Sequence, residues 1–471
     1  MKKVFFALLA LAVLCSCGNS GVRSGSGSGA DGRSRAIDAE LLAVLEQNAF
    51  QSEDNPFFTA SIKDVVRDPS VTLDTTTTYR VRTYGVTDQM KSGRCWLFST
   101  LNILRAESGL GDFQFSQTYG QFYDVLEKSN RCLENIIEHA GEPMDSRYNE
   151  WIFKKPIADG GQFMNAAHLI EKYGVVPLEV MPERFSSTTN LILMNNVREL
   201  LRKYGLELRR VAAMAPAKLH AEASAAGFSG KDVALRSEAL QAVKTQALAD
   251  IYRVLTATLG VPPQTFEWRG RTWTPQTFKQ EFVHHDMEAD YVVFMNDPTR
   301  PYYRTYTVEN TRNCYEYADW TFLNVPMADI DSMALASLKG GVAFYVSADT
   351  EHDNLDPEGI YDMRSFARKD SFLGINSAMT KAEQLESCES RSVHAIAVVG
   401  VRLDGAGKPE SWLVENSFGL SRGADGYVTF SPEWLDRYLY RLVVERRFVP
   451  DSLLELVGGK PSVIPAWNPV Y

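Results

Sequence analysis

Cys95 is the first residue whose type and position predict chemistry. It follows the small, turn-forming pair Ser92-Gly93 and begins a run of apolar residues with helical spacing. The residues on the apolar face of that run are Leu97, Phe98, Leu101 and Leu104. This pattern predicts a buried helix with Cys95 in its first turn, where the partial positive charge of the helix N-terminus favours a thiolate. Gln89, which lies six positions earlier, offers an amide that can donate to an oxyanion, so the segment is typical of a cysteine nucleophile with its oxyanion donor.

A histidine and an asparagine near the end of the chain could complete such a site. Ser392 to Val399 is an apolar, β-branched segment with a single histidine, His394, and predicts a buried strand. Asp404 to Glu410 has the glycine and proline of a turn, and Trp412 to Gly419 predicts the returning strand. An antiparallel hairpin of this kind would bring Asn416 beside His394.

Together these side chains support acyl transfer through a thioester. An imidazole beside a thiol can hold its proton, so His394 would turn Cys95 into a nucleophilic thiolate and later protonate the leaving amine. The Asn416 carbonyl would orient the imidazole, while Gln89 and the Cys95 backbone N–H would stabilise the oxyanion. A lone cysteine is more often inert, and a lone histidine in an apolar strand is more often a core residue. The combination of all four favours the catalytic interpretation.

The composition favours a large globular protein and argues against several kinds of partner. The chain has 471 residues, 45% of them hydrophobic, and a net charge of −10 from 59 acidic and 49 basic residues. Because phosphate binding relies on clusters of lysine and arginine, this balance argues against nucleic acid. The chain contains no Cys-x-x-Cys pair and no His-Glu-x-x-His, so we predict neither a metal nor a cofactor. Cys132, Cys314 and Cys388 are interpreted as small buried apolar residues.

The first residues resemble a bacterial export signal. Two lysines precede Val4 to Leu14, an apolar run too short to span a bilayer comfortably. Leu14-Cys15-Ser16-Cys17 then resembles a lipobox, which we prefer to an ordinary secretory signal or a buried helix. We therefore predict a signal peptide over residues 1–16, a lipid on Cys17, a Gly/Ser-rich tether over 17–36 and a folded body over 37–471. The protein would be an exported lipoprotein, anchored to a membrane on the periplasmic or cell-surface side.

The body mixes helical segments and strands, so we predict an α+β fold. Helical periodicity is found at Ile37 to Asn48, Phe115 to Glu127 and Phe163 to Tyr173. Residues 191–259 are rich in Ala, Leu, Lys, Arg and Glu, which predicts a helical insertion at about 191–290, with helical spacing clearest at Val197 to Tyr204 and Ser237 to Leu259. Further strands are predicted at Tyr291 to Met295, Val342 to Val346, Gly426 to Phe430 and Leu439 to Glu445.

The segment from Gln89 to Phe98 resembles the active-site segment of papain-like cysteine peptidases. Val86 to Trp96 resembles in particular the bleomycin hydrolase (aminopeptidase C) family. Other segments similar to that family, in the same order, are Ala158 to Phe163, Glu171 to Pro177, Ile251 to Val254, Met295 to Pro298, Met379 to Glu383, Trp412 to Ser417 and Ile464 to Pro469. The spacing from Cys95 to His394 is about twice the roughly 130–150 residues of simple papain-like enzymes, which agrees with an insertion.

The resemblance implies a papain-like, two-lobe fold with a helical lobe, an antiparallel β lobe and the helical insertion. It implies that Cys95, His394 and Asn416 form the catalytic triad, with Gln89 as the oxyanion donor. It also implies that the chain is a homo-hexamer acting as a cysteine aminopeptidase on peptides, without a cofactor. The substrate-binding groups implied by the resemblance are the backbone of Gly160 and Gly161 and the terminal carboxylate at Tyr471.

Two alternatives to an aminopeptidase stay open. The chain stops at Tyr471, a few residues before the usual tail of the family, and an open cleft would make it an endopeptidase or an amide hydrolase. A non-catalytic binding or scaffold protein could use the same fold, although the complete set of four site residues argues against this. Phe418 stands where the family has tryptophan and is expected to cover the His394–Asn416 pair in the same way.

Overall fold

The computed structural model describes residues 36–50, 55–225, 227 and 229–468. The chain forms two compact units, one made of residues 1–65 and 370–376 and the other of residues 66–369 and 377–471. The predicted signal peptide, the lipidated Cys17, the tether up to residue 35 and the terminal Tyr471 lie outside the described residues. Within the described part, no helix combines the length and the apolar character that crossing a membrane requires.

Short helices make up most of the described part of the first unit. α2 (Ala39–Glu46) lies within the helix predicted from residue 37 to 48, and the Asp38 carboxylate caps it by accepting from the Leu41 N–H at 2.9 Å. The other elements, two of which reach one residue into the second unit, are η1 (Pro56–Phe58), α3 (Ile62–Val66) and α14 (Lys369–Leu373). Phe57 packs edge to face against Phe50 and Phe372, with ring centroids 5.7 and 5.3 Å apart. This aromatic cluster joins the two chain segments of the unit.

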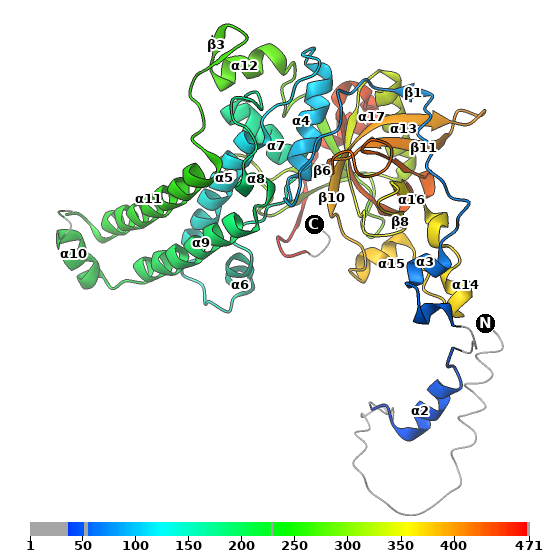
Figure 1. The fold of residues 1–471 in the computed structure, drawn as a ribbon. Helices are drawn as coiled ribbons and strands as arrows, with labels where there is room; N and C mark the ends of the chain where they lie inside the picture. The colour runs from blue at the N-terminus through cyan, green and yellow to red at the C-terminus, as the bar shows by residue number, and fades with distance from the viewer. Residues whose placement is uncertain (1–35, 51–54, 226, 228, 469–471) are drawn as a thin grey trace, which may run out of the picture. The chain divides into compact units, whose positions relative to one another are not determined.

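The first half of the second unit is mostly helical (Figure 1). Its helices are α4 (Cys95–Glu107), α5 (Gln117–Glu138), α6 (Arg147–Lys154), α7 (Phe163–Tyr173), α8 (Phe185–Thr188), α9 (Leu191–Ala212), α10 (Pro216–Ala225), α11 (Asp232–Leu259) and α12 (Pro275–Phe282). α5, α9 and α11 lie side by side, and the buried face of α9 carries Val197, Leu201 and Leu208 at helical spacing. The two helical segments predicted between residues 191 and 259 are confirmed within α9 and α11. A small hairpin, β2 (Phe266–Trp268) and β3 (Arg271–Trp273), precedes α12.

Within the described residues, twelve strands form one sheet in the order β14-β5-β6-β4-β13-β7-β10-β11-β12-β9-β8, and β1 pairs with β10. The strands are β1 (Tyr79–Arg80), β4 (Tyr291–Met295), β5 (Arg304–Val308), β6 (Thr321–Asn324), β7 (Phe344–Ala348), β8 (Asn354–Leu355), β9 (Ile360–Tyr361), β10 (His394–Leu403), β11 (Pro409–Glu415), β12 (Tyr427–Phe430), β13 (Leu439–Glu445) and β14 (Ser462–Ile464). The helical elements between and after them are α13 (Met327–Lys339), η2 (Met363–Phe366), α15 (Lys381–Glu386), α16 (Pro432–Tyr438), η3 (Arg446–Phe448) and α17 (Asp451–Val457).

The β lobe is mainly antiparallel, as expected, and also contains parallel pairs. Most neighbours are antiparallel, but β4 and β6, β9 and β12, and β5 and β14 are parallel. These three pairs join strands that are not consecutive in the chain, so their direction depends on the route of the intervening chain and not on the local residue pattern.

Several predicted elements have the predicted bounds. β4, β13 and α7 agree to the residue. β10 begins at His394, two residues after the predicted start, and pairs antiparallel with β11 as expected. β7 starts two residues later than predicted, and α5 continues beyond the predicted end to Glu138. Ser116 caps α5 by accepting from the Tyr119 N–H at 3.1 Å, which explains why the helix starts where it does.

The prediction that Cys388 is buried is wrong. Cys132 and Cys314 are buried, but Cys388 is exposed. It follows the end of α15 with φ 60, in the left-handed region, where the chain turns at the surface. This turn decides whether Cys388 is buried or exposed, and the spacing of hydrophobic residues in the sequence does not reveal the turn.

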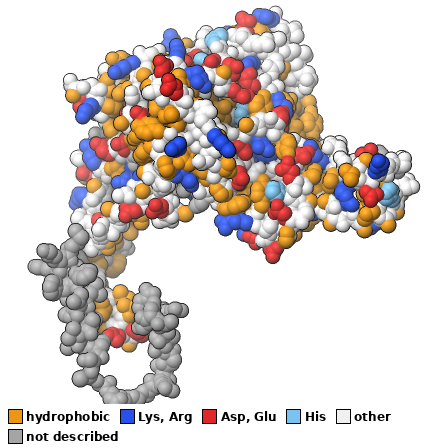
Figure 2. Space-filling model, turned by 180° about the vertical axis from the view of Figure 1, so that it is seen from behind, with side chains coloured by type: hydrophobic (Ala, Val, Ile, Leu, Met, Phe, Trp, Pro, Cys, Tyr) orange, Lys and Arg blue, Asp and Glu red, His pale blue; other side chains and the backbone are white. Residues whose placement is uncertain are grey.

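The described residues on the face seen in Figure 2 carry charges of both signs. Lys and Arg side chains are scattered among acidic and apolar ones and are not gathered into a continuous patch. A phosphate backbone binds to extended basic surfaces, so this face does not provide that kind of electrostatic footprint.

α4 lies between the sheet and the other helices (Figure 1). On the sheet side, Ser99 Oγ donates to the carbonyl oxygen of Ala395 in β10 at 2.9 Å. On the helix side, α5 approaches so closely that a Cβ at Gly120 would lie 2.9 Å from the Leu97 side chain. The position of Cys95 is therefore set from both sides of the helix that begins with it.

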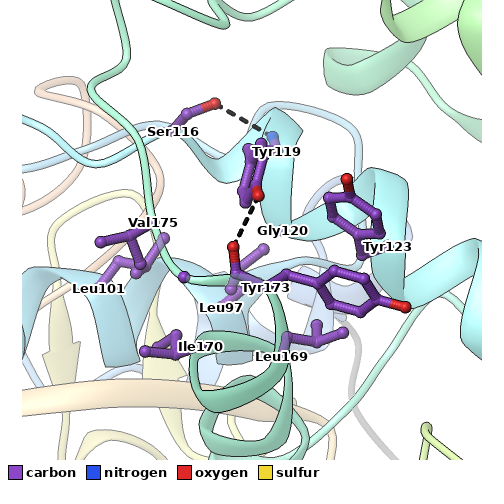
Figure 3. A pocket seen from close by; sticks show the side chains of 11 residues that line it. Leu97, Leu101, Ser116, Tyr119, Gly120, Tyr123, Leu169, Ile170, Tyr173 and Val175 are labelled. Carbon is purple, nitrogen blue, oxygen red and sulfur yellow. Dashed lines mark hydrogen bonds between the residues drawn. The ribbon is translucent and has the colours of Figure 1, made fainter. Parts of the chain in front are cut away.

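A small apolar cavity between α4, α5 and α7 shows the packing behind α4 (Figure 3). Its walls include Leu97, Leu101, Leu169, Ile170 and Val175. The Tyr119 hydroxyl donates to the carbonyl oxygen of Tyr173 at 2.8 Å across one side of it. None of the predicted catalytic residues lines this cavity, so it belongs to the core that holds α4 in place.

Candidate active site

Cys95 is the first residue of α4, as predicted, and is 8% exposed. The residue before it, Arg94, is buried and forms a two-pronged ion pair with Glu183, at 3.0 and 2.8 Å. Arg94 Nε also donates to Ser92 Oγ at 2.9 Å. Because a planar guanidinium fixes both distance and orientation, this pair holds the turn that presents the thiol.

The Gln89 side chain is held by hydrogen bonds at both of its polar atoms. Its Oε1 accepts from Ser417 Oγ and its Nε2 donates to the carbonyl oxygen of Ser92, both at 2.6 Å. The Gln89 backbone N–H also donates to the Ser417 carbonyl at 2.9 Å. The primary amide has two N–H groups and Ser92 takes one of them, so the second can donate to another acceptor. The Gln89 side chain thus links the turn before Cys95 to the segment that follows Asn416.

His394 and Asn416 are in contact, as the predicted hairpin required. His394 Nε2 lies 2.9 Å from Asn416 Oδ1, and the same oxygen accepts from the Ser417 backbone N–H at 2.8 Å. The Ser417 donor identifies this atom as the amide oxygen, so the imidazole carries its proton on Nε2. The second ring nitrogen, Nδ1, is therefore the basic one and is available to exchange a proton.

Phe418 covers the imidazole. The two rings are stacked, with centroids 4.7 Å apart and planes 8° from parallel. The Arg422 guanidinium lies 4.5 Å from the centre of the Phe418 ring. The expected apolar cover over the His394–Asn416 pair is therefore present, and it keeps water from competing for the hydrogen bond between them.

The start of α4 lies against the start of β10. The backbone amide of Ala395, the residue after His394, is near enough to the Cys95 thiol to lower its pKa. One turn further along α4, Ser99 donates to the carbonyl oxygen of the same Ala395 at 2.9 Å. The elements that carry Cys95 and His394 are thus brought together.

Burial disfavours an isolated charge on either group. It raises the pKa of Cys95 to about 11, while the Ala395 amide acts in the opposite direction and Asp159 adds to the increase. Burial also lowers the pKa of His394 to about 4; the Asn416 hydrogen bond opposes this and the Arg422 charge adds to it. A proton passed from the thiol to the imidazole creates two opposite charges with no net charge, so these groups are expected to ionise together.

Gly160 and Gly161 lie beside the thiol segment. Trp96 Nε1 donates to the Asp159 carbonyl oxygen at 3.3 Å, and a Cβ on Gly161 would lie 2.7 Å from the Trp96 ring. A Cβ on Gly160 would meet nothing within 4 Å, so this backbone is open to an approaching molecule. Glycine at 161 permits the close packing of the loop, and Gly160 leaves one edge of the loop accessible.

A buried cation anchors this loop from behind. Lys128 Nζ donates to the Gly160 carbonyl oxygen at 2.8 Å and to the Asp124 carboxylate at 2.6 Å. The Asp159 carboxylate accepts from the Gly93 backbone N–H, which ties the loop to the turn before Cys95. These contacts fix the spacing between the glycine loop and the thiol.

Sequence reasoning missed several of these supporting residues. Ser417 had a visible signal, since it follows Asn416 within the Trp412–Ser417 segment singled out by resemblance. Lys128, Asp124 and Glu183 had none, because each acts on the site only through contacts with residues distant in the chain. Of the predicted site residues, Cys17 and Tyr471 lie outside the described part of the chain.

Comparison with known proteins extends over nearly the whole chain. Residues 37–471 match the sequence model of the Peptidase C1-like family. Aminopeptidase C of Listeria monocytogenes serovar 1/2a is 33% identical over 454 residues, which cover 92% of this chain and 97% of the relative. Aminopeptidase W of Lactobacillus delbrueckii subsp. lactis is 34% identical over 410 residues, covering 84% and 89% of the two chains. The crystal structure of PepW from Lactobacillus rhamnosis HN001 matches with a TM-score of 0.80 at 31% identity, covering 93% of this chain and 99% of that one.

Proposed function

The chain belongs to the Peptidase C1-like family, and we propose that it is a cysteine aminopeptidase with Cys95, His394 and Asn416 as its triad. Its fold is that of a papain-like cysteine peptidase. One observation supports the assignment of the triad. Asn416 holds the His394 ring at 2.9 Å, and Ser99, one turn after Cys95 in α4, binds the backbone carbonyl oxygen of Ala395, the residue next to His394.

The first half of the reaction is acylation of the thiol. His394 Nδ1 takes the thiol proton as the sulfur of Cys95 attacks the carbonyl carbon of the substrate. A C–S bond forms, the carbonyl oxygen takes up the negative charge, and the C–N bond then breaks. The imidazolium returns its proton to the leaving amine, which leaves a thioester on Cys95. In the second half, water attacks this thioester with His394 again as the base, and the acid product departs.

Asn416 acts on this sequence through the imidazole. Its carbonyl accepts the Nε2 proton and keeps Nδ1 directed away from the amide, and it also stabilises the imidazolium that forms in each half-reaction. Phe418 excludes water from this hydrogen bond, so the orientation persists when substrate enters and leaves.

The oxyanion is stabilised by the second Nε2–H of Gln89 and the backbone N–H of Cys95. Ser417 and Ser92 hold the Gln89 amide in one orientation before substrate arrives. A donor that is fixed beforehand need not reorganise when the charge develops, so its contribution to the rate is large.

The substrate class follows from the family and from the open glycine loop. The relatives compared above are named aminopeptidases, and the backbone of Gly160 is accessible for pairing with a peptide main chain. The competing proposal, an endopeptidase or amide hydrolase with an open cleft, predicts indifference to a blocked N-terminus.

Two peptides of the same sequence, one with a free and one with an acetylated N-terminus, distinguish an aminopeptidase from an endopeptidase or amide hydrolase. We expect the free peptide to be cleaved with a kcat/KM at least about 30-fold higher, since a charge-assisted contact with the ammonium is lost on acetylation. Equal cleavage of both peptides would contradict the aminopeptidase and leave the cysteine peptidase in place.

Selective alkylation tests whether the site is catalytic at all. Iodoacetamide at neutral pH should modify Cys95 much faster than Cys132, which is buried in α5 and whose thiol has a pKa raised by that burial to about 12. Equal, slow modification of both thiols would favour the binding or scaffold protein.

We also propose that the protein is exported and carries a lipid on Cys17, on the strength of the lipobox-like residues alone. Labelled palmitate should be incorporated by the full chain and by Cys15→Ser, but not by Cys17→Ser. Incorporation into Cys17→Ser would contradict the proposal. The homo-hexamer is likewise a proposal, and light scattering on the purified protein tests it.

A further inference from the structure

Three side chains from separate parts of the chain meet at the far end of α4. Glu107 is the last residue of α4, His285 lies between α12 and β4, and Glu445 is the last residue of β13. Each can offer one ligand atom, and these atoms all lie within 4.8 Å of one another. The group is about 18 Å from Cys95, since twelve residues of α-helix rise 1.5 Å each, so it is separate from the candidate active site.

His285 has a carboxylate on the side of each ring nitrogen. Its Nε2 lies 2.8 Å from Glu107 Oε2 and 4.0 Å from Glu445 Oε1. Its Nδ1 faces Asp290 Oδ2 at 3.7 Å, an ion-pair distance that is longer than a hydrogen bond. A metal-binding imidazole generally has a carboxylate or carbonyl on the side of its second nitrogen, and Asp290 is the group in that place.

The distances are close to those that a metal would impose. Zn²⁺ binds nitrogen and oxygen at about 2.0–2.2 Å, so tetrahedral neighbours in its shell are about 3.4 Å apart. The two distances from Nε2 lie on either side of this value. To reach this spacing, the Glu107 carboxylate would move away from His285 Nε2 and the Glu445 carboxylate would move toward it, from 2.8 and 4.0 Å to about 3.4 Å. These movements would open a coordination site between the three side chains.

Unpartnered buried oxygens provide a second, independent indication of a missing ligand. Tyr291 is 6% exposed, and its hydroxyl has no hydrogen-bond partner among the described residues. Tyr291 lies opposite Glu445 in the β4–β13 pair, and its hydroxyl is within electrostatic reach of both Glu107 and Glu445. Glu107 Oε1 is likewise buried without a partner in the described structure. Leaving such groups unsatisfied is costly, so their convergence on one spot indicates an occupant.

The charges at this spot also favour a cation. Three carboxylates, those of Glu107, Glu445 and Asp290, surround one imidazole. The guanidinium that pairs with them is that of Arg447, whose Nε lies 2.5 Å from Glu445 Oε2. With a neutral imidazole the group has an excess of two negative charges, which one dication would neutralise.

We propose that Glu107, His285 and Glu445 bind one divalent transition-metal ion, of which Zn²⁺ is the representative. The imidazole ligand favours such ions over Mg²⁺ and Ca²⁺, which prefer oxygen alone. A fourth position would hold water that the Tyr291 hydroxyl can bind. The ion would join the end of α4 to the β4–β13 edge of the sheet, so its role is to position the helix that carries Cys95.

Local sequence spacing does not reveal this group because its members are far apart in the chain. Glu107 and His285 are separated by 178 positions, and no ligand spacing relates them. His285 lies in the connection before β4. Only the packing of α4 against the sheet brings the three side chains together.

Zn²⁺ titration of purified Cys95→Ala protein tests the proposal, since that substitution removes the proposed catalytic thiol, which could compete for the ion. We expect one tightly bound equivalent by calorimetry, and a loss of affinity of at least about 100-fold in His285→Gln and Glu107→Gln made in the same background. The matched control is His220→Gln, because exposed His220 pairs with Asp232 at 2.6 Å in the same way but belongs to no three-ligand group in the described chain. That control should bind like its parent.

Two further measurements keep the test decisive if a variant folds poorly. Zn²⁺ at 100 times Kd should raise the apparent Tm of the Cys95→Ala protein by roughly 3 °C and leave that of the His285→Gln double variant unchanged. Co²⁺ in place of Zn²⁺ should give visible bands without a sulfur charge-transfer band. Failure of folded Cys95→Ala protein to bind one equivalent, or equal affinity in His285→Gln, overturns the proposal and leaves an ion-pair network at this end of α4.

Discussion

The two ends of α4 lie beside histidines in opposite electrostatic surroundings. At the first residue, His394 contacts an amide and an aromatic ring, and burial lowers its pKa to about 4. At the last residue, the hydrogen bond to Glu107 raises the pKa of His285, with Glu445 and Asp290 adding to the effect. A neutral imidazole can accept a proton, whereas one among carboxylates favours a cation. The same side chain is therefore suited to proton transfer at one end and to charge pairing at the other, because its neighbours differ.

This difference separates chemistry from stability along a single helix. The start of α4 holds groups whose isolated charges are suppressed by burial and which can ionise only together. Its end holds carboxylates that favour a positive charge on or beside His285. Substitutions at the start should therefore change the rate, and substitutions at the end should change the stability.

The sharpest contrast is between Cys95→Ala and Glu107→Gln. Removing the nucleophile should lower kcat at least about 10⁴-fold, as losses of catalytic nucleophiles do, with an unchanged circular dichroism spectrum. Glu107→Gln, at the other end of the same helix, should keep kcat within about threefold. Steady-state hydrolysis of one peptide by both variants measures kcat. A comparable loss of kcat in Glu107→Gln would contradict the claim that the end of α4 affects stability and not the rate.

Gln89→Ala should produce the next largest loss. Without the amide donor the oxyanion loses one preorganised hydrogen bond, and kcat should fall by about 10²–10³-fold with little change in KM. Ser417→Ala is the matched control, because it removes the hydrogen bond to Gln89 Oε1 but keeps the donor. It should lose clearly less activity, and an equal loss would mean that Gln89 acts mainly as a structural link.

The dependence of kcat/KM on pH should follow the protonation of His394, at the start of α4, and not that of His285, at its end. Because burial lowers the His394 pKa to about 4, the neutral base persists above that pH, and kcat/KM should fall as the pH drops through about 4. His285→Gln should leave this acid limb in place. Circular dichroism at each pH excludes acid unfolding, and an acid limb centred at pH 6 or above would contradict the buried environment of His394.

The smallest effect is expected from His285→Gln on stability in metal-free protein. His285 has a raised pKa, so its contribution is fully present below the unfolded pKa of about 6.5 and is lost as pH rises through the folded pKa. In EDTA the substitution should lower the apparent Tm by roughly 1–3 °C at pH 6 and by less at pH 9. His220→Gln should change it by under 1 °C, and an equal decrease at both pH values would contradict the charged pair.

Local pattern was enough for much of the fold and for part of the site. β4, β13 and α7 have the predicted bounds because hydrophobic periodicity and turn residues are local properties. The hairpin of β10 and β11 brought Asn416 to His394 as expected, since a short turn restricts how the two strands can pair. The mixed direction of the sheet and the exposed Cys388 were not predicted, because both depend on the path of the chain over long distances.

The sequence by itself determined which residues could carry chemistry, in what order they occur and, for Cys95 and His394, which helix and which strand present them. Residue type and short-range spacing contain that information. Tertiary structure alone decided that the start of α4 would lie against the start of β10, and that Glu107, His285 and Glu445 would meet at the other end of α4. The physical reason is that the burial and the charge around a side chain come from neighbours contributed by distant segments, and these set its pKa and therefore what it can do.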